Sequence, residues 1–92
     1  MKTEEDIKNA VDEFMTRKLD DMGWQPFGFD NEVVDHIKNM CMSILQTKYK
    51  IGYPGGSFVQ AVVDNDLMGA FGRADHINKD FIWLYVELLY NY

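Results

Sequence analysis

Apolar residues recur every three or four positions over most of this chain, the spacing of one face of an α-helix. The first such stretch lies between Thr3 and Gly23, and its stripe comprises Ile7, Val11, Phe14, Met15, Leu19 and Met22. Thr3 and Asp6 have a capping-box spacing, in which each side chain bonds the other residue's backbone N–H. We therefore predict an amphipathic helix over residues 3–22.

Two clusters of glycine and proline, at residues 23–28 and 52–56, interrupt the helical pattern, because proline cannot continue a helix. Between them, a stripe predicts a helix that begins at Asp30 or Asn31 and ends near Lys50. After the second cluster we expect one helix from Ser57, as its N-cap with Gln60 at the third position, to Arg73. The two stripes are Val33, Val34, Ile37, Met40, Cys41, Ile44 and Leu45, and Phe58, Val62, Val63, Leu67, Ala70 and Phe71.

The segment after Asp75 keeps the helical period but is apolar nearly all round. One side has Ile77, Phe81, Ile82, Tyr85, Leu88 and Leu89, and the other has Trp83, Leu84, Val86 and Tyr90. Its aromatic and β-branched content also allows a strand. A helix that is apolar all round has to be buried on several sides. A chain of 92 residues has little material for this, so we expect the segment to pack against another subunit.

These elements predict one all-α domain over residues 1–92. A domain of this size has a marginal core of its own, and the single cysteine, Cys41, excludes a disulfide framework. Self-association is the remaining way to bury more surface. The lone thiol also fits a reducing compartment, so we expect a cytoplasmic protein.

The net charge of −6 disfavours binding to DNA or to anionic membranes. The longest apolar run, residues 81–86, is far shorter than the roughly 20 residues that span a bilayer, and the first residues have no apolar signal core. We therefore expect neither DNA nor a membrane as a partner.

The side chains that enzymes need are sparse. His36, His76 and Cys41 form no His-x-x-x-His or Cys-x-x-Cys pair, which leaves too few soft ligands for zinc. Asp64 and Asp66 lie two positions apart on a predicted helix and point to different faces, so they do not form an acid/base couple. We expect no catalytic residue, no metal and no cofactor, and we interpret the chain as a binding protein.

Three residues are candidates for ligand binding: Trp24, Lys38 and Arg73. One arginine per chain, repeated around an oligomer axis, would form a ring of guanidinium groups that suits phosphates. Lys38 would add a cation, and Trp24 an indole face on which a purine can stack. The ordinary alternatives are a helix-end cation for Arg73, a solvated lysine for Lys38 and a hydrophobic plug for Trp24.

The same positions also give a family resemblance. Gly23-Trp24, Ile37-Lys38, Ser57 and Phe71-Gly72-Arg73-Ala74 are similar to motifs of the phage sponge proteins that defeat CBASS immunity by sequestering cyclic oligonucleotides. Their helical hairpin is shared with anti-Thoeris sponges. The resemblance implies a short N-terminal helix plus an antiparallel helical hairpin, assembling into a compact homo-oligomer, a hexamer, in the host cell cytoplasm.

The resemblance also implies roles for the candidate residues. Trp24 and Lys38 would belong to pockets for cyclic dinucleotides between paired subunits, and Arg73 to a separate pocket for cyclic trinucleotides near a three-fold axis. The protein would then be a viral immune-evasion protein that sequesters these messengers without cleaving them. Two other functions stay open: an acidic protein-binding inhibitor of a host defence or nucleic-acid-binding protein, and an enzyme that degrades the same messengers.

Overall fold

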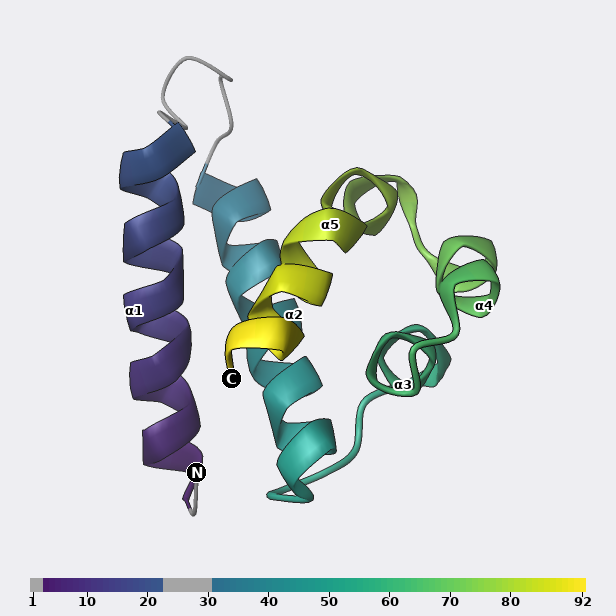
Figure 1. Ribbon diagram of the computed structural model, residues 1–92, viewed down its shortest axis with the longest axis horizontal. Helices are drawn as coiled ribbons and strands as arrows, with labels where there is room; N and C mark the ends of the chain where they lie inside the picture. Colours follow the sequence, from purple (N-terminus) through teal and green to yellow (C-terminus); the bar gives the residue numbers. More distant parts are fainter. Residues whose placement is uncertain (1–2, 23–30) are drawn as a thin grey trace.

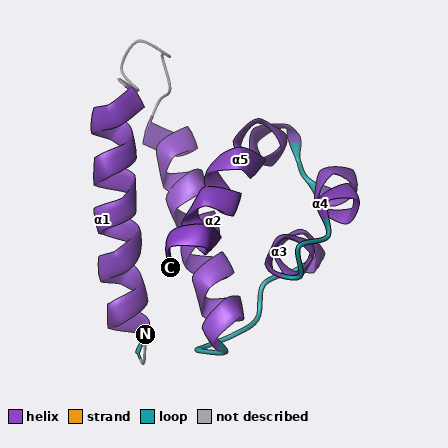
Figure 2. Cartoon of the chain, in the orientation of Figure 1, coloured by secondary structure: helices purple, strands orange, loops and turns teal. Residues whose placement is uncertain are grey.

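The computed structural model describes residues 3–22 and 31–92, which form five helices and no strand (Figures 1 and 2). The all-α class is therefore confirmed, and the strand alternative for the last segment is excluded. The helices are α1 (Glu4–Met22), α2 (Asn31–Tyr49), α3 (Ser57–Val63), α4 (Leu67–Arg73) and α5 (His76–Asn91). Within these ranges, none of the helices combines the length and the apolar character that crossing a bilayer requires.

Helix α2 is the central element. It contacts α1 on one side and α3 and α5 on the other, and α1 lies beside it in the opposite direction (Figure 1). Helices α3 and α4 pack together at the far side of the molecule from α1. The first helix spans 19 residues, as many as α2, so it is not the short element that the family resemblance implies.

The start of α1 is the predicted capping box. Thr3 donates its backbone N–H to Asp6 Oδ2 at 3.1 Å, and Asp6 donates its backbone N–H to Thr3 Oγ1 at 3.1 Å. Helix α5 also begins with a capping side chain, since Asp75 Oδ1 accepts from the backbone N–H of Asn78 at 2.7 Å. These bonds satisfy N–H groups that the first turn of a helix leaves unpaired.

The prediction of one continuous helix from Ser57 to Arg73 is wrong. The chain breaks at residues 64–66, where Asn65 has φ 61°, in the left-handed region that asparagine tolerates better than most residues. Asp66 then caps α4 by accepting from the backbone N–H of Gly69 at 3.0 Å. Short acidic and amide side chains compete in this way with helical hydrogen bonds.

The predicted cap of the third helix is also wrong. Gly56 occupies the N-cap position and makes no side-chain cap bond, and Ser57 is the first helical residue. Gln60 Nε2 instead donates to the backbone oxygen of Gly55 at 2.9 Å, which ties the first turn of α3 to the preceding loop.

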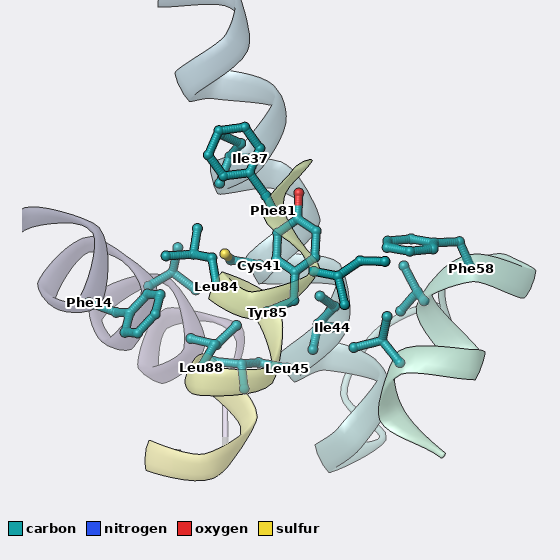
Figure 3. Close-up of a cluster of buried hydrophobic side chains, with 14 of the residues drawn as sticks. Phe14, Ile37, Cys41, Ile44, Leu45, Phe58, Phe81, Leu84, Tyr85 and Leu88 are labelled. Carbon is teal, nitrogen blue, oxygen red and sulfur yellow. The ribbon is translucent and has the colours of Figure 1, made fainter. Parts of the chain in front are cut away.

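The core lies where α5 crosses α2 (Figure 3). Tyr85 and Phe14 are the largest fully buried side chains, and the rings of Tyr85 and Phe58 meet edge to face with centroids 6.0 Å apart. Other buried members are Ile7, Val11, Ile37, Cys41, Ile44, Leu45, Val59, Val62, Phe81, Ile82, Leu84 and Leu88. The other helices of the same chain thus bury one face of α5, while Trp83, Val86 and Tyr90 on its other face remain exposed. That this face packs against another subunit stays a prediction.

The positive φ at Asn65 generates a stability prediction. We expect Asn65→Ala to lower the free energy of unfolding by about 1 kcal/mol, because an L-residue with a Cβ is strained there, and Asn65→Gly to be close to neutral. The neighbouring variant Asp64→Ala is the control, since Asp64 has φ −79°. Thermal unfolding followed by circular dichroism would measure all three, and equal effects of alanine and glycine at Asn65 would contradict this account.

Candidate ligand-binding site

A polar cluster fixes the start of α5 against α2. Asn78 is the one buried polar residue among the described positions, with 3% of its surface exposed. Its Oδ1 accepts from the Tyr85 hydroxyl at 2.7 Å and lies 3.3 Å from His36 Nε2. His36 Nε2 is also 3.6 Å from Asp75 Oδ2. The cluster therefore holds the side chains at the N-terminal end of α5 in a defined place.

An open hollow of about 290 Å³ lies beside this cluster. Its polar lining consists of Ser57 at the start of α3, Arg73 at the end of α4, Asp75 at the N-cap of α5 and Asn78 in the first turn of α5. Its apolar lining is Met40, Phe58 and Val59. A concave surface that combines apolar side chains with a few converging polar groups is typical of a small-molecule site.

A second open hollow, of about 220 Å³, also has Arg73 in its lining. It is lined by Ser57, Gln60, Ala61, Asp64, Asp66 and Arg73. Ser57 and Arg73 thus line both hollows, although the break between α3 and α4 separates them in the sequence. The two hollows and the residues that line them are called the Arg73 site below.

The guanidinium of Arg73 is only weakly engaged within the chain. Its Nη1 lies 3.9 Å from Asp66 Oδ2, and about half of each side chain is exposed. An exposed ion pair at this distance contributes little to stability. The approach of the Arg73 side chain to Asp66 needs a glycine at position 69, because a Cβ there would lie 2.1 Å from Asp66 Oδ2 and 2.4 Å from Arg73 Nη1. Gly69 is a site residue that the sequence interpretation missed.

The charge of the Arg73 site is unbalanced. Among its described lining residues, the three carboxylates of Asp64, Asp66 and Asp75 surround the single guanidinium of Arg73. A ligand with two or more phosphate charges would meet a net negative surface in one copy of the chain. A second cation source is therefore needed before this site holds such a ligand tightly.

Lys38 lies away from the Arg73 site. Its Nζ is 2.6 Å from Asp12 Oδ1, and this ion pair joins α2 to α1. The two groups are not aligned as a hydrogen bond, since Asp12 Oδ1 has no hydrogen-bond partner. Residues two apart on a helix point to nearly opposite sides. His36 accordingly contacts α5 while Lys38 contacts α1, and Arg73 pairs with Asp66 instead, so these contacts do not bring Lys38 and Arg73 together in one chain.

Of the three predicted ligand-binding residues, Trp24 lies outside the described residues. The structure does bring Arg73 and Ser57 to the same two hollows. Both residues belong to the motifs that carry the family resemblance. Asp75 could be placed near Arg73 from the sequence, since it follows two positions later. The contribution of Asn78 had no signal in the sequence, because it depends on how the start of α5 folds back towards α3.

The buried titratable groups near the core are held in their protonated forms. Burial raises the pKa of the Cys41 thiol to about 12. Burial, followed by the nearby Cys41 and Asp75, also raises the pKa of Tyr85. Nucleophilic cysteines work as thiolates, and Cys41 at neutral pH is a protonated, apolar side chain. Within residues 3–22 and 31–92, no cluster of three or more histidine, cysteine or carboxylate side chains has a metal-binding arrangement.

Comparison with known proteins finds no matching family model, no matching curated protein and no matching solved structure. The function therefore has to be inferred from the chemistry of the site.

The Tyr85–Asn78 hydrogen bond generates a second stability prediction. We expect Tyr85→Phe to lower the free energy of unfolding by about 1–3 kcal/mol, because it removes the hydroxyl that donates to a buried acceptor. Tyr90→Phe makes the same chemical change at a residue that is 89% exposed, and should change stability by less than about 0.5 kcal/mol. Urea unfolding would compare the two, and equal losses would argue against the buried bond.

The raised pKa of Cys41 predicts a pH dependence. Between the ordinary thiol value of 9.0 and the folded value of about 12, the unfolded chain loses this proton while the folded chain keeps it. The contribution of Cys41 to stability is therefore complete below pH 9 and falls as the pH rises, by up to about 1.4 kcal/mol per pH unit. Urea unfolding between pH 8 and 11 should show a shallower fall for Cys41→Ala, and identical slopes would contradict the assignment.

Proposed function

We propose that this protein is a non-enzymatic, viral immune-evasion protein that sequesters cyclic oligonucleotide second messengers without cleaving them and thereby blocks CBASS-type antiphage signalling. The observation that carries the proposal is the weakly engaged guanidinium of Arg73 between two hollows. Cyclic di- and trinucleotides are the ligand class.

The Arg73 site offers the groups that such a ligand needs. A guanidinium binds phosphate through two parallel N–H···O bonds, and exchanging Asp66 for phosphate gives up only a long, exposed ion pair. The hydroxyl of Ser57 and the side-chain amides of Gln60 and Asn78 line the same hollows and suit the polar edges of a base. Met40 and Phe58 supply apolar surface for its faces.

The excess of carboxylates at this site supports binding by an assembly. Several copies meeting near one axis would bring several Arg73 side chains to one ligand, which is the arrangement that the resemblance implies. Sequestration needs an affinity in the nanomolar range, about 12 kcal/mol. An enclosed site between subunits reaches this more readily than an open hollow, since it is pre-organised and excludes water.

One observation favours a second candidate, an acidic protein-binding inhibitor. The same three carboxylates at the Arg73 site, together with the net charge of −6, suit a basic protein surface better than a free anion. Such an inhibitor would form a complex that weakens steeply as salt rises, because its attraction is largely between exposed charges.

A capture experiment tests the proposal. The protein is incubated with a panel of cyclic di- and trinucleotides, separated from free ligand and heat-unfolded, and the released nucleotides are identified by chromatography. We expect intact cyclic oligonucleotide, and we expect Arg73→Ala to lower the trinucleotide affinity at least tenfold. Arg17→Ala is the matched control, because Arg17 lies on α1 and donates to the Tyr92 hydroxyl at 2.8 Å, away from the Arg73 site.

Each other outcome identifies a different function. Absence of any bound nucleotide across the panel rejects the proposal. Recovery of cleaved nucleotide after long incubation indicates the enzyme. A salt-sensitive complex with a basic host protein, without nucleotide uptake, favours the acidic inhibitor. Lys38→Ala, with folding checked by circular dichroism, asks whether dinucleotide and trinucleotide binding are separable.

A further inference from the structure

An exposed, mostly apolar stripe runs along α5 on the side opposite the core. It consists of Lys79, Trp83, Val86 and Tyr90, at intervals of four, three and four residues, which places them on one narrow face of the helix. Trp83 is 46% exposed, Val86 50% and Tyr90 89%. These four residues are called the α5 stripe.

The apolar surface continues beyond α5. Val86 shares a hollow with Leu67 of α4, which is 58% exposed. Val86 and Tyr90 share a larger hollow, of about 300 Å³, with Val63 of α3. The surface therefore spans three helices and has the raised and hollowed relief against which another surface can pack.

The polar group of the largest side chain in the stripe is already satisfied. Trp83 Nε1 donates to the backbone oxygen of Asp80 at 2.9 Å, within the same helix. The indole can therefore be buried against a partner without leaving an unpaired donor, whose burial would cost about 1–3 kcal/mol. Buried tryptophans with satisfied N–H groups are typical anchors of protein interfaces.

We propose that the α5 stripe binds the α5 stripe of a second copy of this chain, with the two helices antiparallel. The spacing of four, three and four reads the same in both directions. A two-fold axis passing between positions 84 and 85 therefore places Lys79 opposite Tyr90 of the second copy, and Trp83 opposite Val86 of the second copy. The proposal names the partner in the self-association proposed above and does not depend on the ligand.

Charge complementarity selects the antiparallel orientation. In that orientation the ammonium of Lys79 meets the ring of Tyr90 and the C-terminal end of α5 in the second copy. Both attract a cation, the ring through its π face and the helix end through its partial negative charge. A parallel pair would instead set the two Lys79 side chains against each other.

The area is sufficient for a specific pair. With about 150–250 Å² for a fully exposed large side chain, the exposed fractions of Trp83, Val86, Tyr90 and Leu67 give on the order of 500 Å² in each copy. Two copies then bury about 1,000 Å², the lower bound of a biological interface. The stripe contains a lysine and no carboxylate, so a basic partner is not the occupant that it favours.

Sedimentation equilibrium of the ligand-free protein tests the pairing. We expect a mass of at least two chains, and we expect Val86→Glu and Tyr90→Lys each to raise the dissociation constant at least tenfold. The first buries an unpaired carboxylate against Trp83, and the second sets an ammonium against Lys79 of the second copy. Tyr53→Glu is the matched control, because Tyr53 is 92% exposed and lies outside the stripe. Tyr90 has little of its surface buried in one chain, so its variant keeps the test valid if Val86→Glu disturbs folding.

Thiol crosslinking tests the orientation. In a Cys41→Ala background, we expect Lys79→Cys and Tyr90→Cys to crosslink to each other when the two variants are mixed, and neither to crosslink with itself. Self-linked Tyr90→Cys, which keeps Lys79 in both copies, would overturn the antiparallel pairing. A single-chain mass for the native protein, or full tolerance of both Val86→Glu and Tyr90→Lys, would overturn the interface. A dimer that takes up no nucleotide would reject the ligand alone, and a nucleotide-binding monomer would reject this interface alone.

Discussion

Helix α5 connects the parts of this protein, and the burial of Tyr85 and Asn78 against α2 fixes how it lies. The Tyr85 hydroxyl donates to Asn78 Oδ1 inside a core that is otherwise apolar. Both residues belong to α5, so the bond moves with the helix, and the contact that ties this pair to α2 is the 3.3 Å approach of His36 Nε2 to the same oxygen. Rotating α5 about its axis would separate Asn78 from His36 and carry Tyr85 out of the core, and exposing a large apolar side chain is costly. The face that α5 shows to solvent therefore follows from which of its side chains are buried against α2, and the contacts of His36 with Asn78 and Asp75 hold the start of the helix beside the Arg73 site.

The sequence was sufficient for the helices whose boundaries depend on local chemistry. The Thr3–Asp6 pair and the start of the last helix after Asp75 are formed by neighbouring residues, and both were predicted. The break at Asn65 was missed because the apolar stripe continues across it to Leu67. The spacing of apolar residues shows that stripe. It does not show that the short polar side chains of residues 64–66 can compete with the helix for backbone N–H groups.

The candidate site was predictable only in part, for a different reason. Arg73 and Ser57 could be proposed from their own residue types. Asn78 joins them through the tertiary fold. The ion pair of Lys38 with Asp12, 26 positions earlier in the chain, also depends on the tertiary fold, and it engages Lys38 away from that site. Several described cations are engaged in this way: Lys18 pairs with Glu87, and Lys48 donates to the backbone oxygen of Leu89. These cations hold helices together, and Arg73 is not among them, since its ion pair is with the cap of its own helix.

The two oxygens of Asp66 have separate partners, and this has a consequence for how the site could open. Oδ1 accepts from the backbone of Gly69 and holds the first turn of α4, whereas Oδ2 faces Arg73. The arginine can swing towards an incoming anion while the helix on which it stands keeps its cap. Opening would then require a side-chain rotation rather than local unfolding, a motion on the picosecond-to-nanosecond scale, so a guest would meet a scaffold that is already in place.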